Sequence, residues 1–291
     1  MSSLPTTGAG PSALVWTDAV SVVLFDLDGT LHDDPRAIDH YAAALETAVP
    51  DRGTLRAEVD AVVEGRHPAA RPGLFVEPQR GLVLSAPEWV VLTATDWRGH
   101  AVEVPGDLGG PVRHDGPLRY FGDRWQIVAA LAARRGADDA TLRAAFGSAR
   151  RFVNERCTDL ARLDCLDGLL DRLASGRQLL LATNTSEALG KPLVDRLDLH
   201  HPFAIVRFDA RKPAGCADLI MEAHNRWGTS AREVMVVGDN LWNDLLPPAE
   251  QGCRTVHIDP LGTDPTGRWS SARYDDLGAF ASALEAVPDV R

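Results

Sequence analysis

The sequence predicts an α/β fold in which a long insertion follows the first strand of a parallel sheet. In the second half of the chain, short runs of apolar and β-branched residues alternate with helical patterns, as they do in βαβ units. One further run of this kind, Ala19–Phe25, stands far from the others. The chain has 291 residues, of which 45% are hydrophobic and 24% charged. We therefore expect about two ordinary globular domains.

The predicted core strands are short apolar runs bounded by turn residues, a pattern typical of strands that are buried on both faces. They are Ala19–Phe25, Gln178–Ala182, Ala204–Phe208, Glu233–Val237 and Thr255–Ile258. Helical patterns lie beside and between them at Leu166–Ala174, Glu187–Leu197, Ala217–Trp227 and Asp244–Gln251. This alternation predicts parallel strands that are joined by right-handed helical crossovers.

The interval between the first two predicted strands is far too long for a loop of a compact domain, so we expect it to hold a second domain. The predicted organisation is a lead at 1–17, a core at 18–33 and 164–291, and an inserted domain at 34–163. Amphipathic helices are predicted in the insertion at Ile38–Val49, Leu55–Glu64, Asp123–Arg134 and Asp138–Cys157.

Residues 66–118 form an unusual further insert within this second domain. Its first part is rich in Pro and Gly, and Gly106–Pro117 is predicted to be loop. Between these segments, Trp89–Thr95 and His100–Val104 flank a turn that contains Gly99. Two short apolar runs around a glycine turn predict a β-hairpin.

The charge balance and the cysteines exclude several classes of protein. The net charge is −11, and no run of Lys and Arg is present that would neutralise a nucleic-acid backbone. No stretch of about 18 apolar residues occurs, so no membrane span is expected. Four cysteines without a C-x-x-C pair predict reduced thiols and no disulfide framework. We therefore expect a cytoplasmic protein without a nucleic-acid or membrane partner, and its oligomeric state stays open.

Two carboxylates directly follow the first predicted strand. Asp26 and Asp28 are two residues apart and leave the strand end on the same side, and Gly29 permits a tight turn after them. Open parallel sheets bind their ligands at this carboxyl end. Like charges this close repel each other and require a cation or a shared proton. The alternative is an Asp-Gly turn that only terminates the strand.

Further polar groups follow the later strands. Thr183 and Asn184 come directly after the second predicted strand, and their side chains can donate hydrogen bonds to phosphate oxygens. Lys212 precedes a proline in the loop after the third strand, and Asp239 and Asp244 follow the fourth. Taken alone, each of these residues is explained by a helix cap, an ordinary turn or a solvated loop lysine.

Taken together, these groups predict a site for phosphoryl transfer. Successive strand ends at one edge of the sheet each carry a polar group that this chemistry requires. Three or more carboxylates in one crevice repel each other strongly unless a metal ion lies between them. A set of oxygen ligands without Cys or His favours Mg²⁺, which is therefore the expected cofactor.

With these residues in this order, the sequence resembles the haloacid dehalogenase (HAD) superfamily of aspartate-nucleophile phosphatases. The four family motifs are Asp26-x-Asp28-Gly-Thr, the strand end Thr183-Asn184, Lys212 before Pro, and Gly238-Asp239 with Asp244. They cover the core, roughly residues 19–32 and 164–260. The resemblance implies a Rossmann-like parallel-sheet core with a cap inserted after the first motif. We expect this cap to be mainly helical and to carry the extra β-hairpin.

The resemblance also implies chemical roles. Asp26 is the expected nucleophile, which forms an aspartyl-phosphate, and Asp28 is the expected general acid and base. Thr183, Asn184 and Lys212 are the expected phosphate-binding residues.

A set of metal ligands is implied in the same way. The side chains of Asp26 and Asp239 and the backbone carbonyl of Asp28 are expected to bind Mg²⁺. Asp244 is expected to lie behind them and to orient Lys212 or a metal-bound water.

The expected activity is Mg²⁺-dependent hydrolysis of a small-molecule phosphomonoester. Haloalkanoate dehalogenases of the family lack an aspartate two residues after the nucleophile, because halide leaves without a proton; Asp28 therefore favours phosphate esters. One alternative is a phosphomutase, which would use the same residues but return the phosphoryl group to a sugar phosphate. The other is a non-catalytic binding protein, against which the intact set of carboxylates argues.

Several features of the insertion stay open at this level. The hairpin is either a wall or dimer contact that helps to select a substrate, or a surface decoration. Trp89, Trp97 and Trp125 are core residues or stacking platforms for a sugar or base. His32 either contacts the substrate or only begins a helix.

Overall fold

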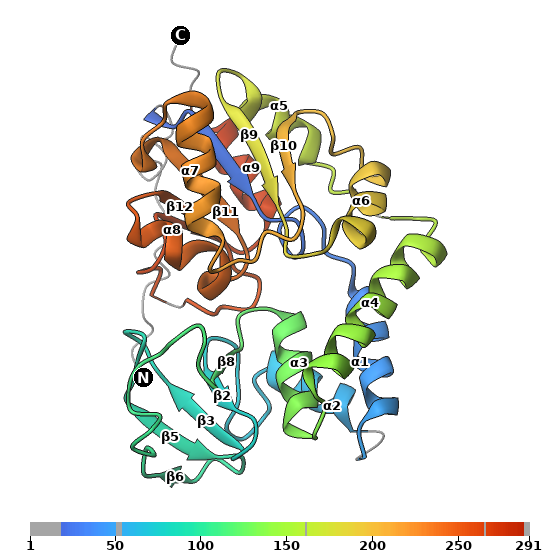
Figure 1. The fold of residues 1–291 in the computed structure, drawn as a ribbon, viewed down its shortest axis with the longest axis vertical. Helices are drawn as coiled ribbons and strands as arrows, with labels where there is room; N and C mark the ends of the chain where they lie inside the picture. Colours follow the sequence, from blue (N-terminus) through green and yellow to red (C-terminus); the bar gives the residue numbers. More distant parts are fainter. Residues whose placement is uncertain (1–18, 51–53, 161, 265, 288–291) are drawn as a thin grey trace.

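The computed structural model describes residues 19–50, 54–160, 162–264 and 266–287, which divide into a larger α/β part and a smaller part of helices and antiparallel strands (Figure 1). The expected lead at 1–17 lies outside the described residues. Every helix in these ranges is too short or too polar to cross a membrane.

A six-stranded parallel sheet forms the centre of the larger part. Its strands are β1 (Val22–Phe25), β9 (Gln178–Ala182), β10 (Phe203–Arg207), β11 (Val234–Gly238), β12 (Arg254–Ile258) and β13 (Ala272–Tyr274). They are arranged in the order β10-β9-β1-β11-β12-β13. Strands β1 and β9 are neighbours although residues 26–177 separate them in the sequence. The predicted α/β fold with a parallel sheet is confirmed.

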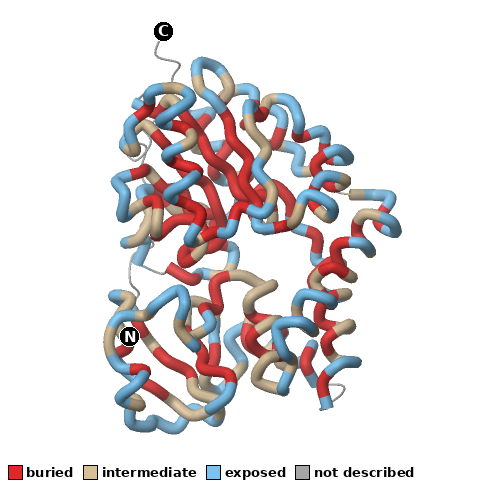
Figure 2. The backbone as a smooth tube through the Cα atoms, in the orientation of Figure 1, coloured by how far each residue is buried: buried red, intermediate tan, exposed pale blue. Residues whose placement is uncertain are grey.

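Helices cover both faces of this sheet, because successive side chains of a strand point to opposite faces. Helices α5 (Leu166–Ala174), α6 (Glu187–Arg196) and α9 (Leu277–Glu285) cover one face, and α7 (Cys216–Trp227) and α8 (Leu246–Glu250) cover the other. In β1, Val23 and Phe25 pack on the first face, and Val22 and Leu24 on the second. The strands therefore form the buried middle layer (Figure 2), and their carboxyl ends share one edge.

The smaller part, which we call the cap, comes from the interval between β1 and α5. Its helices are α1 (Pro35–Ala48), α2 (Leu55–Val63), α3 (Arg124–Arg134) and α4 (Asp139–Arg156), and these confirm the four predicted there. They pack around an apolar cluster that includes Leu45 and Ile127. Helices α1 and α4 lie side by side where the chain enters and leaves the cap (Figure 1).

The predicted hairpin is confirmed and belongs to a larger sheet. Strands β5 (Thr93–Asp96) and β6 (Ala101–Val102) pair antiparallel across the turn at Gly99. Strands β2 (Phe75–Glu77), β3 (Leu82–Ser85) and β8 (Arg119–Tyr120) extend the pair into a five-stranded sheet, and β4 (Val90–Val91) pairs with β7 (Gly110–Pro111). Strands β2, β3, β7 and β8 were not predicted, because each is only two to four residues long. Strand β7 lies within Gly106–Pro117, so the prediction of loop over that whole segment was wrong.

An aromatic cluster joins this sheet to the core. Trp242, in the loop that follows β11, has its ring 4.9 Å from that of Trp89 and 5.3 Å from that of Phe75, centroid to centroid. Tyr120 packs against the same rings. Of the two interpretations of Trp89, the structure supports a packed residue. The hairpin sheet is therefore seated on the core next to a loop that carries predicted site residues.

Candidate active site

All seven predicted site residues line one pocket of about 250 Å³ at the carboxyl edge of the parallel sheet. From the core come Asp26, Asp28, Thr183, Asn184, Lys212, Asp239 and Asp244. They follow β1, β9, β10 and β11, whose ends meet because parallel strands terminate at the same edge. Their placement follows from topology, and their chemical roles stay predictions.

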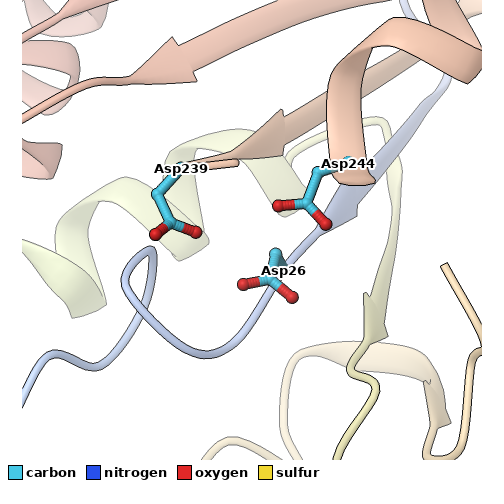
Figure 3. A group of neighbouring side chains, drawn as sticks. All are labelled: Asp26, Asp239 and Asp244. Atoms are coloured by element: carbon cyan, nitrogen blue, oxygen red, sulfur yellow. The ribbon is translucent and has the colours of Figure 1, made fainter. Parts of the chain in front are cut away.

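Three of these carboxylates form a buried acidic cluster. Asp26, Asp239 and Asp244 each offer an oxygen, and these oxygens lie within 4.8 Å of one another. Figure 3 shows the three side chains converging from the end of β1 and from the loop after β11. All three residues are buried. Such a set contains only oxygen donors, which suits a hard divalent cation.

The first motif approaches Asp239 so closely that it requires a glycine. Gly29 has a φ of +88°, and a Cβ built on it would lie 2.1 Å from Oδ2 of Asp239. The next residue, Thr30, donates a hydrogen bond from Oγ1 to Oδ1 of Asp239 at 3.4 Å. Any side chain at position 29 would therefore push apart the two loops that bring Asp26 and Asp239 together.

The loop after β11 fixes the third carboxylate. Asp244 lies in η3 (Leu241–Leu245), a single π-helical turn. The backbone N–H of Asn240 donates to Oδ2 of Asp244 at 3.2 Å, and the side chain of Asn240 caps the turn by accepting from the backbone N–H of Asn243. Asp244 thus points back toward the strand end.

Lys212 supplies the positive charge beside this cluster. Its Nζ contacts Oδ1 of Asp26 and lies 2.8 Å from Oδ1 of Asp244. Burial alone lowers the pKa of Lys212, but Asp244 and Asp26 outweigh it and hold that pKa above its ordinary value. Asp244 therefore contacts Lys212, as one of its two predicted roles requires, and also belongs to the acidic cluster.

Asn184 holds the loop of Lys212 in place. Its side-chain Oδ1 accepts from the backbone N–H of Lys212 at 2.7 Å, and its Nδ2 donates to the Lys212 carbonyl at 2.9 Å. Because both ends of the amide are engaged, the structure shows Asn184 as a support of Lys212. Its predicted contact with phosphate stays a prediction.

Burial and mutual repulsion change the acidity of the cluster. Burial raises the pKa of Asp26 to about 7, with Asp244 and Asp28 adding to the rise and Lys212 opposing it. Burial and the charge of Asp26 raise the pKa of Asp239 well above its ordinary value. Both shifts favour the protonated carboxylates, and a bound cation would oppose them.

Asp28 points toward the cap. Its carboxylate pairs with Arg150 of α4. It also accepts from Oγ1 of Thr185 at 3.1 Å and from Oγ1 of Thr183 at 3.4 Å. His32 is buried and is not among the lining residues, and burial lowers its pKa. The structure therefore separates the two motif aspartates, with Asp26 in the acidic cluster and Asp28 at the boundary with the cap.

Several lining residues were missed at the sequence level. They are Thr185, Asn240 and Asn243 from the core and Asp123, Phe146 and Arg150 from the cap. Trp125, which the sequence left open as a core residue or a stacking platform, also lines the pocket. Thr185 could have been found from the sequence, because it lies two residues after Thr183 at the end of the same predicted strand. Asp123 looks like an ordinary N-cap, and its side chain does accept from the backbone N–H of Gln126. Nothing in the local sequence marks Arg150 as a pocket residue.

Comparison with solved structures finds proteins of the same fold. The putative HAD-hydrolase YfnB from Bacillus subtilis, bound to magnesium, is 18% identical over 91% of this chain and 99% of its own, with a TM-score of 0.52. The L-2-haloacid dehalogenase RSc1362 is 17% identical over 92% and 99%, with a TM-score of 0.50. A predicted phosphoglycolate phosphatase from Haemophilus somnus 129pt is 15% identical over 92% and 97%, with a TM-score of 0.49.

These likenesses are too distant to carry an activity, and no curated protein matches the chain. The family match is broader: residues 20–252 fit the model of the haloacid dehalogenase-like hydrolases. This range begins before Asp26 and ends after Asp244, and it contains the whole cap. The chain therefore belongs to the haloacid dehalogenase-like hydrolase family.

Proposed function

We propose that this protein is a Mg²⁺-dependent phosphatase that hydrolyses a small-molecule phosphomonoester through an aspartyl-phosphate on Asp26. The observation that supports this most is the contact of Asp26 with Lys212 inside a buried cluster of three carboxylates. A carboxylate nucleophile beside one ammonium, within a set of oxygen donors that could hold a divalent cation, suits the charge of a phosphoryl group.

The acidic cluster fits a magnesium ion. Its donors are carboxylate oxygens, and burial together with repulsion between the carboxylates raises the pKa values of Asp26 and Asp239, so a cation there would stabilise their charged forms. Asp26 and Asp239 would hold the ion, with the backbone carbonyl of Asp28 as a further ligand. When bound, Mg²⁺ would neutralise charge on the phosphoryl oxygens.

The residues of the chain divide the reaction into two displacements. In the first, an Asp26 oxygen forms a bond to phosphorus while the bond from phosphorus to the ester oxygen breaks, and Asp28 gives that oxygen a proton. In the second, Asp28 takes a proton from a water whose oxygen attacks phosphorus. The bond between Asp26 and phosphorus then breaks, and phosphate leaves.

Lys212 and Thr183 stabilise both displacements. The buried ammonium of Lys212 would hold a phosphoryl oxygen as negative charge moves from the nucleophile to the leaving group. Thr183 lines the same pocket, and its hydroxyl donates to Oδ2 of Asp28 at 3.4 Å, so Thr183 would contact the phosphoryl group next to the proton donor.

Asp28 favours phosphatase over dehalogenase chemistry. An alkoxide leaving group needs a proton, whereas a halide does not. Asp28 lines the pocket two residues after Asp26, where it can reach the leaving group. This argument rests on the residue itself, because the solved structures of similar fold include both kinds of enzyme.

The first test is phosphate release from small phosphomonoesters, including p-nitrophenyl phosphate, with and without Mg²⁺. We expect release that EDTA abolishes and Mg²⁺ restores. Asp26→Asn removes the nucleophile and should lower kcat by at least about a thousandfold, whereas Asp39→Asn makes the same chemical change at an exposed site on α1 and should not. Full activity in EDTA or in Asp26→Asn contradicts the proposal, and transfer to a second sugar-phosphate position without phosphate release indicates a phosphomutase.

The second test separates the role of Asp28 from that of Asp26. Asp28→Asn should lower kcat about 10²- to 10⁴-fold for an alkyl phosphate, because the leaving alkoxide then lacks its proton donor. The loss should be much smaller in the burst of p-nitrophenol from p-nitrophenyl phosphate, since this leaving group departs without a proton. Rapid-quench kinetics measure both, and an equal loss in the two first steps would show that Asp28 is not the acid.

The third test follows the protons of the acidic cluster. Because the pKa of Asp26 is raised to about 7, part of the Mg²⁺-free protein carries a proton there at pH 6 and loses it by pH 8. A cation must displace that proton, so Mg²⁺ affinity should increase as pH rises from 6 to 8, by up to about tenfold per pH unit for each proton released. Calorimetry in buffers of different ionisation enthalpy measures the release, and a pH-independent affinity would refute this linkage.

A further inference from the structure

A buried arginine enters the pocket from the cap. Arg150 lies in α4, and its side chain is 3% exposed. Among the described residues that line the pocket, Arg150 and Lys212 are the two cations. Lys212 is occupied by the acidic cluster, and it faces the place where the phosphoryl group is proposed to react. Arg150 contacts Asp28 instead, on the side of the cap.

Two aromatic rings pack against the guanidinium of Arg150. Its Cζ lies 4.9 Å from the ring centroid of Trp125 and 5.3 Å from that of Phe146. Rings within about 6 Å attract a cation through their negative faces. Both rings line the pocket as well, so the guanidinium is built into the cap wall and is not a mobile surface group.

The hydrogen-bonding capacity of Arg150 is only partly used. The same terminal nitrogen, Nη2, contacts Oδ1 of Asp28 and lies 3.5 Å from Oγ1 of Thr185. The buried Nε has no hydrogen-bond partner among the described residues. A buried donor without a partner costs free energy, and the planar fork of an arginine fits the two oxygens of a carboxylate or phosphate. Arg150 therefore keeps donor capacity beyond its contact with Asp28, which an anionic group in the pocket could use.

We propose that Arg150 binds a second anionic group of the substrate, a carboxylate or a phosphate, and thereby selects small phosphomonoesters that carry one. This inference rests on the proposed phosphatase function. The pocket volume of about 250 Å³ lies just below the range of about 300–1,000 Å³ for drug-sized ligands. It fits a phosphorylated compound of a few carbons whose two anionic ends meet Lys212 and Arg150.

The test compares substrates with the same carbon chain that differ in one anionic group. Phosphate release is measured for 3-phosphoglycerate against glycerol 3-phosphate, and for propanediol bisphosphate against hydroxypropyl phosphate. The wild-type protein should show kcat/KM at least about tenfold higher for the anionic member of one pair or both. The pair with the larger ratio identifies the carboxylate or the phosphate as the preferred group.

Variants at position 150 locate this preference. Arg150→Met should abolish the ratio, because kcat/KM falls more for the anionic substrate than for its neutral partner, mainly through a higher KM. Loss of the contact between Arg150 and Asp28 acts on both substrates alike and cancels in the ratio. Arg150→Lys keeps the charge without the fork and should give an intermediate ratio. Arg151→Met is the matched control, because Arg151 is the next residue of α4 and is exposed, and it should keep the wild-type ratio.

The outcomes separate the two proposals. A wild-type ratio near one in both pairs overturns the role of Arg150 while phosphate release itself upholds the phosphatase function. A ratio that persists in a folded Arg150→Met protein, verified by circular dichroism, also overturns it; if Arg150→Met does not fold, the ratio in Arg150→Lys decides in the same way. Absence of phosphate release from every ester, p-nitrophenyl phosphate included, overturns the proposed function and this inference with it.

Discussion

The repulsion between buried carboxylates is the constraint on which the rest of the site depends. Asp26, Asp239 and Asp244 are held within reach of a single ion, and water does not screen them there. Lys212 offsets part of their charge through Asp26 and Asp244. The remaining charge makes the cluster a strong site for protons or a cation. The fold maintains this unfavourable arrangement because β1 and β11 are adjacent strands whose ends cannot separate.

The cap forms a wall of the pocket that also holds the acidic cluster of the core. Asp28 leaves the same strand as Asp26 but pairs with Arg150 of α4, so the first motif connects the core chemistry to the cap wall. A second connection runs through the loop after β11. This loop holds Asp239, and three residues later Trp242 packs against aromatic rings of the inserted sheet. Under the proposed function, the core would bind the phosphoryl group that all substrates share, and the cap would present the groups that distinguish them.

The core strands within residues 22–25 and 178–258 are a part of the fold that the sequence alone predicts. The strand Gln178–Ala182 has its predicted bounds, and the motif residues come together because strand order dictates which ends are neighbours. Local patterns did not reveal β2, β3 or β13, which are too short to show a period. Arg150 could not be predicted, because its place in the pocket depends on how α4 packs against α1 and the core. Asn184 shows that a correct residue can be assigned a different role. Its amide can donate a hydrogen bond to phosphate, but in the structure both ends of the amide bind the backbone of Lys212.

The central claim is that a carboxylate of the protein, and not water, attacks phosphorus first. The stereochemical course at phosphorus tests it most directly, with a phosphorothioate monoester whose two non-bridging oxygens are different isotopes and which is hydrolysed in water of the third isotope. Each in-line displacement inverts the configuration, so two successive displacements through Asp26 predict overall retention in the released chiral thiophosphate. Overall inversion would mean a single attack by water and would contradict the account.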